Sequence, residues 1–246
     1  MEPSTKMRIA ALADLHHGRS DVNLKELFQA VTAQADILLL CGDITDHGLP
    51  DEAKSLAEEI NRHLHVPALA VMGNHDYHSD QSELVDEILG SAGVNVLNGD
   101  SVEIGGVGFA GACGFAGGFD RWTLHPWGER AIRAFVQAAI DEVLKLEMAL
   151  SRLDTTSRVV LLHYAPIRET VVGEPLEIFP FLGSSRLEDP LNHFKVSVAF
   201  HGHAHKGTHA GQTSTGVPVF NVSMPVLRAT FPKRLPFHVI EVERDT

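Results

Sequence analysis

The sequence has little cysteine, no long apolar run and no excess of positive charge. Its two cysteines, Cys41 and Cys113, cannot supply a disulfide framework or the paired thiolates of a zinc ribbon. No apolar run approaches the ~20 residues that a membrane-spanning helix requires. The first residues also lack the basic and apolar parts of a signal peptide. We therefore expect a cytoplasmic protein that does not bind membranes.

The charge balance is acidic, with 20 lysines and arginines against 32 aspartates and glutamates and a net charge of −12. The basic residues form no stripe along the chain. Because proteins bind nucleic acids largely by neutralising phosphates with basic side chains, we do not expect a nucleic-acid partner. Small phosphate esters stay open as ligands, since bound metal ions can supply positive charge locally.

Histidine is abundant, with 15 in 246 residues, and many of these histidines are clustered. The hydrophobic fraction of 44% and the chain length are typical of a soluble protein that can bury a sizeable core without disulfides. No repeat, low-complexity segment or linker divides the chain. We therefore predict a single domain over residues 1–246.

Strands and helices are predicted to alternate in the first third of the chain. Apolar runs predict strands at 7–13, 37–41 and 66–72, and helical spacing predicts helices at 24–34, 50–63 and 81–91. This order predicts parallel strands joined by helical crossovers. Short runs separated by glycines predict hairpin strands of a second sheet, at 94–97, 101–104 and 107–111.

The second half of the chain is predicted to contain one long helix and a late β-rich block. Apolar spacing predicts the helix at 129–153. Predicted strands follow at 158–162, 196–200, 207–213, 217–222 and 236–242. Between them, residues 166–190 form a long segment rich in glycine and proline. Irregular segments of that length are more often functional than structural, so this segment is a candidate substrate lid.

Polar side chains that can bind metals follow five of the predicted strands. The first three strands end in Asp14-Leu15-His16, in Gly42-Asp43 and in Gly73-Asn74-His75-Asp76, and later strands end in His163 and in His203-Ala204-His205. Because the carboxyl ends of parallel strands meet at one edge of a sheet, we expect these side chains to converge there. The i, i+2 spacing within two of the pairs directs both members to the same side of an extended chain.

Five blocks carry a specific resemblance. They read DLH at 14–16, GDITD at 42–46, GNHD at 73–76, HYAP at 163–166 and GHAH at 202–205. In this order the chain resembles the calcineurin-like metallophosphoesterase family, over residues 7–222. The resemblance implies an α/β fold, a four-layer αββα sandwich of two mixed β-sheets flanked by helices. It places the metal site at the C-terminal ends of the strands.

The resemblance also implies a role for each position. The first metal would be held by Asp14, His16 and His205, and the second by Asn74, His163 and His203, with Asp43 bridging the two. His75 matches a histidine that does not bind metal and lies beside the leaving group, and Asp76 matches its orienting carboxylate. A mixed set of imidazole and carboxylate ligands without thiolate suits two divalent or trivalent ions such as Mn, Fe or Zn.

Within the 166–190 segment, Arg186 is a candidate for binding the substrate. Gly183-Ser184-Ser185-Arg186 could present hydroxyls and a guanidinium to a phosphate. The alternative is that Ser184 or Ser185 caps a helix and that Arg186 is solvated. The sequence leaves both open.

These features predict metal-dependent hydrolysis of a phosphoester, with a small phosphodiester such as a cyclic nucleotide preferred. A metal-bridging hydroxide would attack phosphorus while His75 protonates the leaving oxygen as general acid. The alternatives are a phosphomonoesterase, a protein phosphatase and, in a different class, a non-catalytic binding scaffold on the same fold. The expected partner is a small phosphate ester, and the oligomeric state is left open, with a homodimer as one option.

Overall fold

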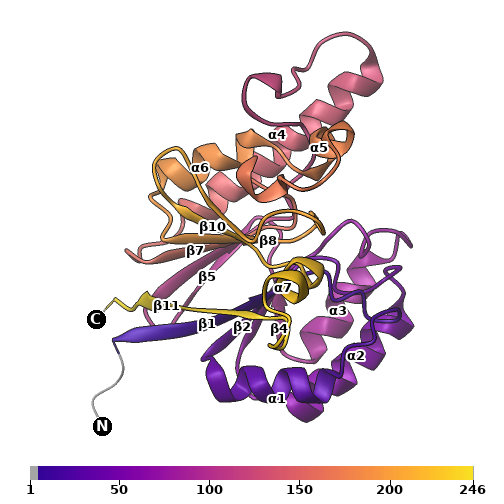
Figure 1. Ribbon diagram of the computed structural model, residues 1–246, viewed down its shortest axis with the longest axis vertical. Helices are drawn as coiled ribbons and strands as arrows, with labels where there is room; N and C mark the ends of the chain where they lie inside the picture. Colours follow the sequence, from indigo (N-terminus) through magenta and orange to yellow (C-terminus); the bar gives the residue numbers. More distant parts are fainter. Residues whose placement is uncertain (1–4, 246) are drawn as a thin grey trace.

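Two β-sheets pack face to face, and helices cover their outer faces (Figure 1). This computed structural model describes residues 5–245. Residues 1–4 and residue 246 lie outside the described residues. The expectation that no signal peptide is present concerns a stretch that includes residues 1–4. Within residues 5–245, no helix combines the length and the apolar character needed to cross a membrane.

The first sheet has the strand order β11-β1-β2-β3-β4. Its strands are β1 (Lys6–Leu12), β2 (Ile37–Cys41), β3 (Ala68–Val71), β4 (Val94–Val96) and β11 (His238–Glu243). The first four are parallel and β11 joins β1 antiparallel. The crossovers are α1 (Leu24–Gln34), α2 (Pro50–His63) and α3 (Ser82–Ser91). Every residue of β2 is buried, as expected for a parallel strand that is covered on both faces.

The second sheet has the order β5-β6-β7-β8-β10-β9. Its strands are β5 (Asp100–Ile104), β6 (Val107–Gly111), β7 (Arg158–Leu161), β8 (Val198–His201), β9 (Ala210–Gln212) and β10 (Pro218–Asn221). β5 and β6 form the predicted antiparallel hairpin, and β6, β7, β8 and β10 are parallel. Helices α4 (Arg130–Leu150) and α6 (Glu188–His193) lie over the outer face of this sheet (Figure 1).

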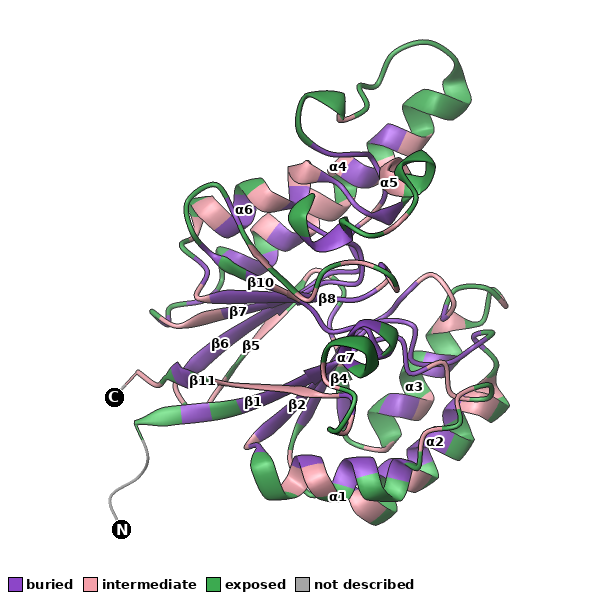
Figure 2. Cartoon of the chain, viewed as in Figure 1, coloured by how far each residue is buried: buried purple, intermediate pink, exposed green. Residues whose placement is uncertain are grey.

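Buried residues form one core that extends from between the sheets to beneath α1, α2 and α3, and another beneath α4 and α6 (Figure 2). The first core joins Ile9 and Leu39 of one sheet to Phe109 and Phe200 of the other. The second includes Leu146 of α4, and it packs against the opposite face of the second sheet. The order helix, sheet, sheet, helix confirms the predicted α/β sandwich with two mixed sheets.

Two predictions about individual segments were wrong, and one helix was missed. The run at 94–97 was assigned to the second sheet, but β4 pairs with β3 in the first, and only the turn at Asn98 and Gly99 carries the chain across. Residues 166–190 are a string of short helices rather than an irregular loop. These are η2 (Glu169–Val171), η3 (Leu176–Ile178), α5 (Phe179–Leu182), η4 (Ser185–Leu187) and the start of α6. A further helix, α7 (Met224–Thr230), was not predicted.

The two sheets are joined by backbone hydrogen bonds at their carboxyl ends. The amide of Ala13, just after β1, donates to the carbonyl of Val222, just after β10, at 2.9 Å, and the amide of Met224 returns a bond to Ala13 at 3.0 Å. The loops that follow β1 and β2 are also paired, because the amides of Asp14 and His16 donate to Gly42 and Asp43. This rim therefore brings the ends of strands from both sheets to one place.

Candidate metal centre

The predicted ligands converge at this rim as two groups. The ligand atoms of Asp14, His16 and His205 all lie within 4.8 Å of one another, and so do those of Asp43, His163 and His203. The first group is called the open half-site below, and the second, together with Asn74, the deep half-site. The short helix η1 (Asp120–Trp122) contributes none of these ligands.

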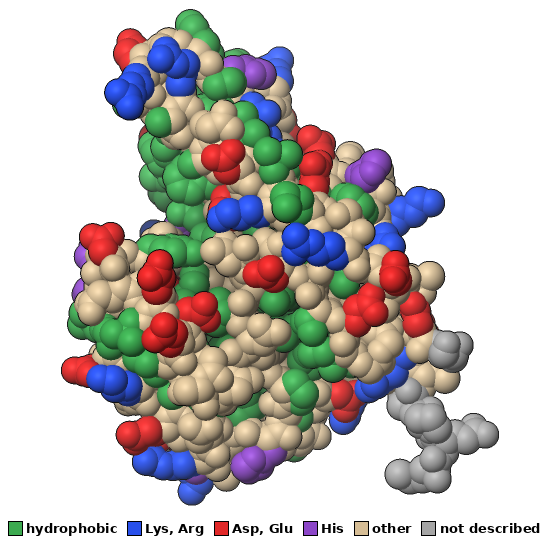
Figure 3. Space-filling view, turned by 180° about the vertical axis from the view of Figure 1, so that it is seen from behind, with side chains coloured by type: hydrophobic (Ala, Val, Ile, Leu, Met, Phe, Trp, Pro, Cys, Tyr) green, Lys and Arg blue, Asp and Glu red, His purple; other side chains and the backbone are tan. Residues whose placement is uncertain are grey.

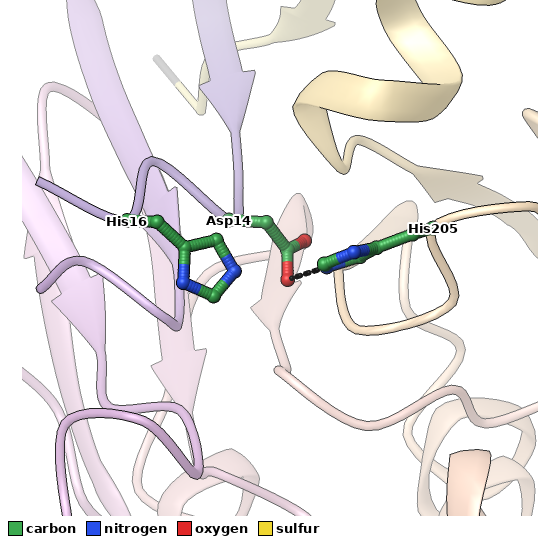
Figure 4. Close-up of side chains that lie close together, drawn as sticks. All are labelled: Asp14, His16 and His205. Atoms are coloured by element: carbon green, nitrogen blue, oxygen red, sulfur yellow. Dashed lines mark hydrogen bonds and ion pairs between the residues drawn. The ribbon is translucent and has the colours of Figure 1, made fainter. Parts of the chain in front are cut away.

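In the open half-site, His16 and His205 lie on either side of the Asp14 carboxylate (Figure 4). His205 Nε2 donates to Asp14 Oδ1 at 2.8 Å. Both ring nitrogens of His16 are buried and neither makes a hydrogen bond, although Nδ1 lies 3.1 Å from the Asp46 carboxylate and Nε2 lies 3.7 Å from that of Asp43. Because buried polar nitrogens are rarely left unpaired, Nε2 in particular indicates that another group completes the site, and a cation fits it.

In the deep half-site, His163 Nε2 lies 2.9 Å from Asn74 Oδ1 and 3.4 Å from Asp43 Oδ1. The other carboxylate oxygen, Asp43 Oδ2, lies 3.7 Å from His16 Nε2 in the open half-site. One carboxylate thus directs its two oxygens toward two different groups of ligands. This is the arrangement that a bridging ligand between two cations requires.

The backbone is strained at four of the seven proposed ligands. Asp14, His16, Asp43 and His203 have φ values of 59°, 44°, 48° and 67°, whereas only three other non-glycine residues in 5–245 have positive φ. Such conformations cost about 1–3 kcal/mol each and concentrate at functional sites. Strain at residues from three separate loops indicates that the surrounding fold holds these side chains in a required geometry.

Two glycines make room for the deep half-site. A Cβ atom at Gly42 would lie 2.3 Å from His163 Nδ1, and one at Gly73 would lie 2.2 Å from Asp43 Oδ1. No side chain is therefore compatible with the packed ligands at either position. Gly42 also has a φ of +84°, which residues other than glycine rarely adopt.

The charges of the ligands suit a cation. Burial alone would raise the pKa of Asp14, but the hydrogen bond from His205 and the nearby histidines lower it to about 2. Burial lowers the pKa of His203 to about 3 and also lowers the pKa of His16, whereas at His205 the effect of burial is outweighed by the Asp14 carboxylate, which raises the pKa. Ionised carboxylate and neutral imidazole are the forms that bind metal ions.

His75 lies beside the open half-site, and its ring is 4.5 Å from that of His16, centroid to centroid. Its Nδ1 donates to the carbonyl of Asp46 at 2.6 Å, which fixes the ring and leaves Nε2 available. The Asp46 carboxylate lies 3.1 Å from His16 Nδ1 on the other side. The GDITD loop therefore positions both His75 and His16.

Asp76 is fully buried, and its hydrogen bonds go to neighbouring loops and not to the His75 ring. Its carboxylate accepts hydrogen bonds from the amides of Ile44, Thr45 and Gly73 and from the Thr45 hydroxyl, at 2.6–3.1 Å. Burial and the nearby Asp43 raise its pKa. The contacts tie the GNHD turn to the GDITD loop, so any influence of Asp76 on His75 passes through the backbone.

Arg186 does not line either of the two clefts beside the metal centre, which are described below. Its amide donates to the hydroxyl of Ser184, which caps η4, and its guanidinium donates to the carbonyl of Leu124 at 2.8 Å. The cap at Ser184 matches the alternative that the sequence left open, but Arg186 is half-buried against Leu124 and not solvated. They give no observation in favour of a substrate-binding Arg186.

Two clefts flank the centre. One, of about 500 Å³, is lined by the open half-site and His75 together with Arg19, Asp21 and Arg228, and is called the basic cleft below. The other, of about 600 Å³, begins at Asn74 and includes Tyr77, Phe115 and Tyr164, and is called the aromatic cleft. In Figure 3, hydrophobic side chains gather along the hollow between the upper and lower parts of the molecule.

Sequence reasoning missed the two arginines of the basic cleft. Arg19 follows the DLH block by only three residues, but it carries no motif of its own. Arg228 lies on α7, the helix that was not predicted. The signal for that helix was present, because Ser223 and Pro225 are typical residues for a helix start.

Comparison with known proteins gives a family and a curated relative. The family model described as calcineurin-like phosphoesterase matches residues 7–207. A protein of Rhodococcus erythropolis named probable cyclic nucleotide phosphodiesterase is 26% identical over 216 residues, which cover 81% of this chain. The match spans 62% of that relative's length.

Solved structures share the fold. Phosphopantetheinyl hydrolase from Mycobacterium tuberculosis superposes with a TM-score of 0.69 at 14% identity, covering 94% of this chain and 95% of the other. A purple acid phosphatase from yellow lupin seeds gives a TM-score of 0.53 at 14% identity, covering 91% of this chain and 44% of the other. At these identities the likeness concerns the fold alone.

Proposed function

The chain belongs to the calcineurin-like phosphoesterase family, and from this we propose that it hydrolyses a small phosphodiester at a two-metal centre. The observation that carries the proposal is the position of Asp43, whose two carboxylate oxygens face two separate groups of ligands. A site for a single metal ion, or a histidine cluster with a purely structural role, would not require a carboxylate with its two oxygens directed to two groups of ligands.

In this proposal, the open half-site holds one cation through Asp14, His16 and His205, and the deep half-site holds the other through Asn74, His163 and His203. Asp43 is shared by both. When bound, two such cations lower the pKa of a water molecule and stabilise negative charge on the phosphoryl oxygens. The ligand set suits Mn, Fe or Zn, and we propose no single one of them.

His75 acts as the general acid. Its Nδ1 is held by the Asp46 carbonyl, so the protonated ring has only Nε2 to offer to a leaving oxygen. It lines the basic cleft, so the leaving group would be in that cleft. Proton transfer from a positioned histidine typically contributes about 10²–10⁴-fold in rate.

Two further observations support a diester over a monoester. A phosphodiester has a substituent on each side of phosphorus, and this centre has a cleft on each side. The curated relative is named as a cyclic nucleotide phosphodiesterase. A phosphomonoesterase would need only one of the two clefts.

The test is a substrate comparison with the Mn²⁺-loaded protein. We expect faster turnover of bis(p-nitrophenyl) phosphate than of p-nitrophenyl phosphate. His75→Ala should lower turnover by at least about 10²-fold while two metal ions per chain are retained. His63→Ala, a change on α2, is the matched control and should leave both quantities unchanged.

Three outcomes would contradict the proposal. A preference for the monoester would favour the phosphomonoesterase alternative. If the wild-type protein bound no metal and turned over neither ester, the chain would be a binding scaffold. Loss of metal in His75→Ala would show that His75 is a ligand and not the acid.

A further inference from the structure

We infer that the basic cleft binds a second anionic group, carried by the leaving group of the substrate, through Arg19 and Arg228. The inference rests on the proposed function, because His75 defines which side of the centre receives the leaving group. It narrows the substrate class to diesters whose leaving group has a carboxylate, sulfonate or phosphate of its own.

Arg19 is an exposed arginine at the wall of the cleft. Within residues 5–245, its guanidinium has no ion-pair or hydrogen-bond partner, although acidic residues outnumber basic ones in this chain. The backbone that carries it is fixed, because its amide donates to the carbonyl of His16 at 3.0 Å. An uncompensated positive charge is thus held next to the open half-site.

Arg228 stands on α7 at the same cleft. Its Nη2 pairs with Asp21 Oδ1 at 3.1 Å, which orients the guanidinium. A guanidinium has five N–H donors, so one such contact leaves most of them free for a ligand. The helix itself is anchored by the buried side chains of Met224 and Leu227, so the position of the charge is set by the fold.

The aromatic cleft has the opposite character. Its charged residues are Asp141, Glu142 and Lys145, and Lys145 is neutralised by Glu142 at 2.6 Å. The aromatic rings of Tyr77 and Tyr164 supply much of the remaining wall. An anionic group would meet a net negative charge there, whereas an uncharged ring or chain would be accepted.

The two clefts therefore discriminate between the ends of a diester. The leaving group, on the His75 side, meets two arginines and two aspartates, one of which is the proposed metal ligand Asp14, and the retained substituent meets aromatic rings and carboxylates. Guanidinium groups recognise carboxylates and phosphates through paired N–H donors. A diester with a single negative charge, shared by its phosphoryl oxygens, would leave Arg19 without a partner and Arg228 with Asp21 alone.

The experiment compares inhibitors that differ only in this second charge. The probes are ω-carboxyalkyl phosphonates with two to five methylenes and the matched ω-carboxamides, which have the same shape without the charge. Inhibition constants are measured against bis(p-nitrophenyl) phosphate on the Mn²⁺-loaded protein. Calorimetric titration of the same probes gives affinities that do not depend on turnover.

We expect at least one carboxylate to bind about fivefold more tightly than its carboxamide, since exposed ion pairs contribute up to about 1 kcal/mol each. The preference should shrink in high salt, because charges near the surface are screened over about 10 Å at 0.1 M. The Arg19→Gln, Arg228→Gln double variant should lose the preference. Arg62→Gln, a matched change on α2, should keep it.

Equal affinity of the two probes at every chain length would overturn the inference. So would a preference that survives in the double variant, provided that its melting temperature matches the parent. Failure of the proposed function is a different result, namely no turnover of either ester by the metal-loaded protein, and the calorimetric arm still tests the arginines in that case.

Discussion

The two half-sites are built from similar side chains but in different surroundings. His163 of the deep half-site is completely buried, whereas the side chain of His205 in the open half-site is 40% exposed. The deep half-site is enclosed by Gly42, Gly73 and the strand ends, and the open half-site forms the wall of a cleft. The comparison teaches that the histidine at the bottom of the deep half-site belongs to the core, whereas His205 of the open half-site lies at the wall of a cleft.

The largest effect is expected where the two half-sites meet. In Asp43→Asn, one oxygen and the negative charge shared by both groups are lost, so both metal ions should bind weakly. Mutation of a residue that only hydrogen-bonds to a metal ligand typically lowers activity by up to ~100-fold, and Asp43→Asn should lower turnover by more than this. Metal analysis after desalting should find fewer than one ion per chain. Retention of two ions would exclude Asp43 as the bridge.

The second prediction separates the two half-sites by their packing. His163→Ala and His205→Ala should each leave about one metal ion per chain. In the metal-free protein, however, only His163→Ala leaves a cavity in the core, and it should lower the free energy of unfolding by about 2–4 kcal/mol. His205→Ala should lower it less, by about 1–2 kcal/mol, because the buried Asp14 carboxylate loses the hydrogen bond from His205 but keeps the one from the His203 amide. Urea unfolding in the presence of EDTA measures both values, and equal losses would erase the distinction.

The third prediction concerns the glycines that enclose the deep half-site. Gly42 and Gly93 both have φ above +80°, but a Cβ atom at Gly42 would overlap His163 whereas one at Gly93 meets nothing within 4 Å. Alanine at either position should cost about 1–2 kcal/mol for the backbone. Gly42→Ala should cost about 1–3 kcal/mol more for the overlap. The melting temperature should therefore fall further in Gly42→Ala, and metal should be lost only there.

The convergence of the ligands could be predicted because each one follows a short apolar strand, often directly after a glycine. Asp43 and Asn74 are marked in this way, and parallel strands carry such residues to one edge. The packing of the second sheet on the first was implied by the family resemblance and not by the strand order. Each ligand could thus be recognised from the residues next to it in the sequence, and the parallel sheet then places the ligands together.

Other features depended on contacts that a single sequence does not contain. The β4 strand has only three residues, and its partner is chosen by tertiary packing, so its assignment to the second sheet was wrong. Arg19 and Arg228 are 209 positions apart in the sequence. They line the same cleft because α7 is hydrogen-bonded to the end of β1. Arg186 was proposed from its neighbours in sequence, while its actual partner, the carbonyl of Leu124, is distant in the chain. The roles proposed for the metal ligands and for His75 stay predictions.

The central claim is that one carboxylate joins two metal ions in two different surroundings. The most direct measurement is anomalous diffraction from crystals of the Mn²⁺-loaded protein. We predict two peaks, one contacted by Asp14, His16 and His205 and the other by Asn74, His163 and His203, with Asp43 touching both. A single peak, or a peak contacted by His75 instead of these ligands, would contradict the account.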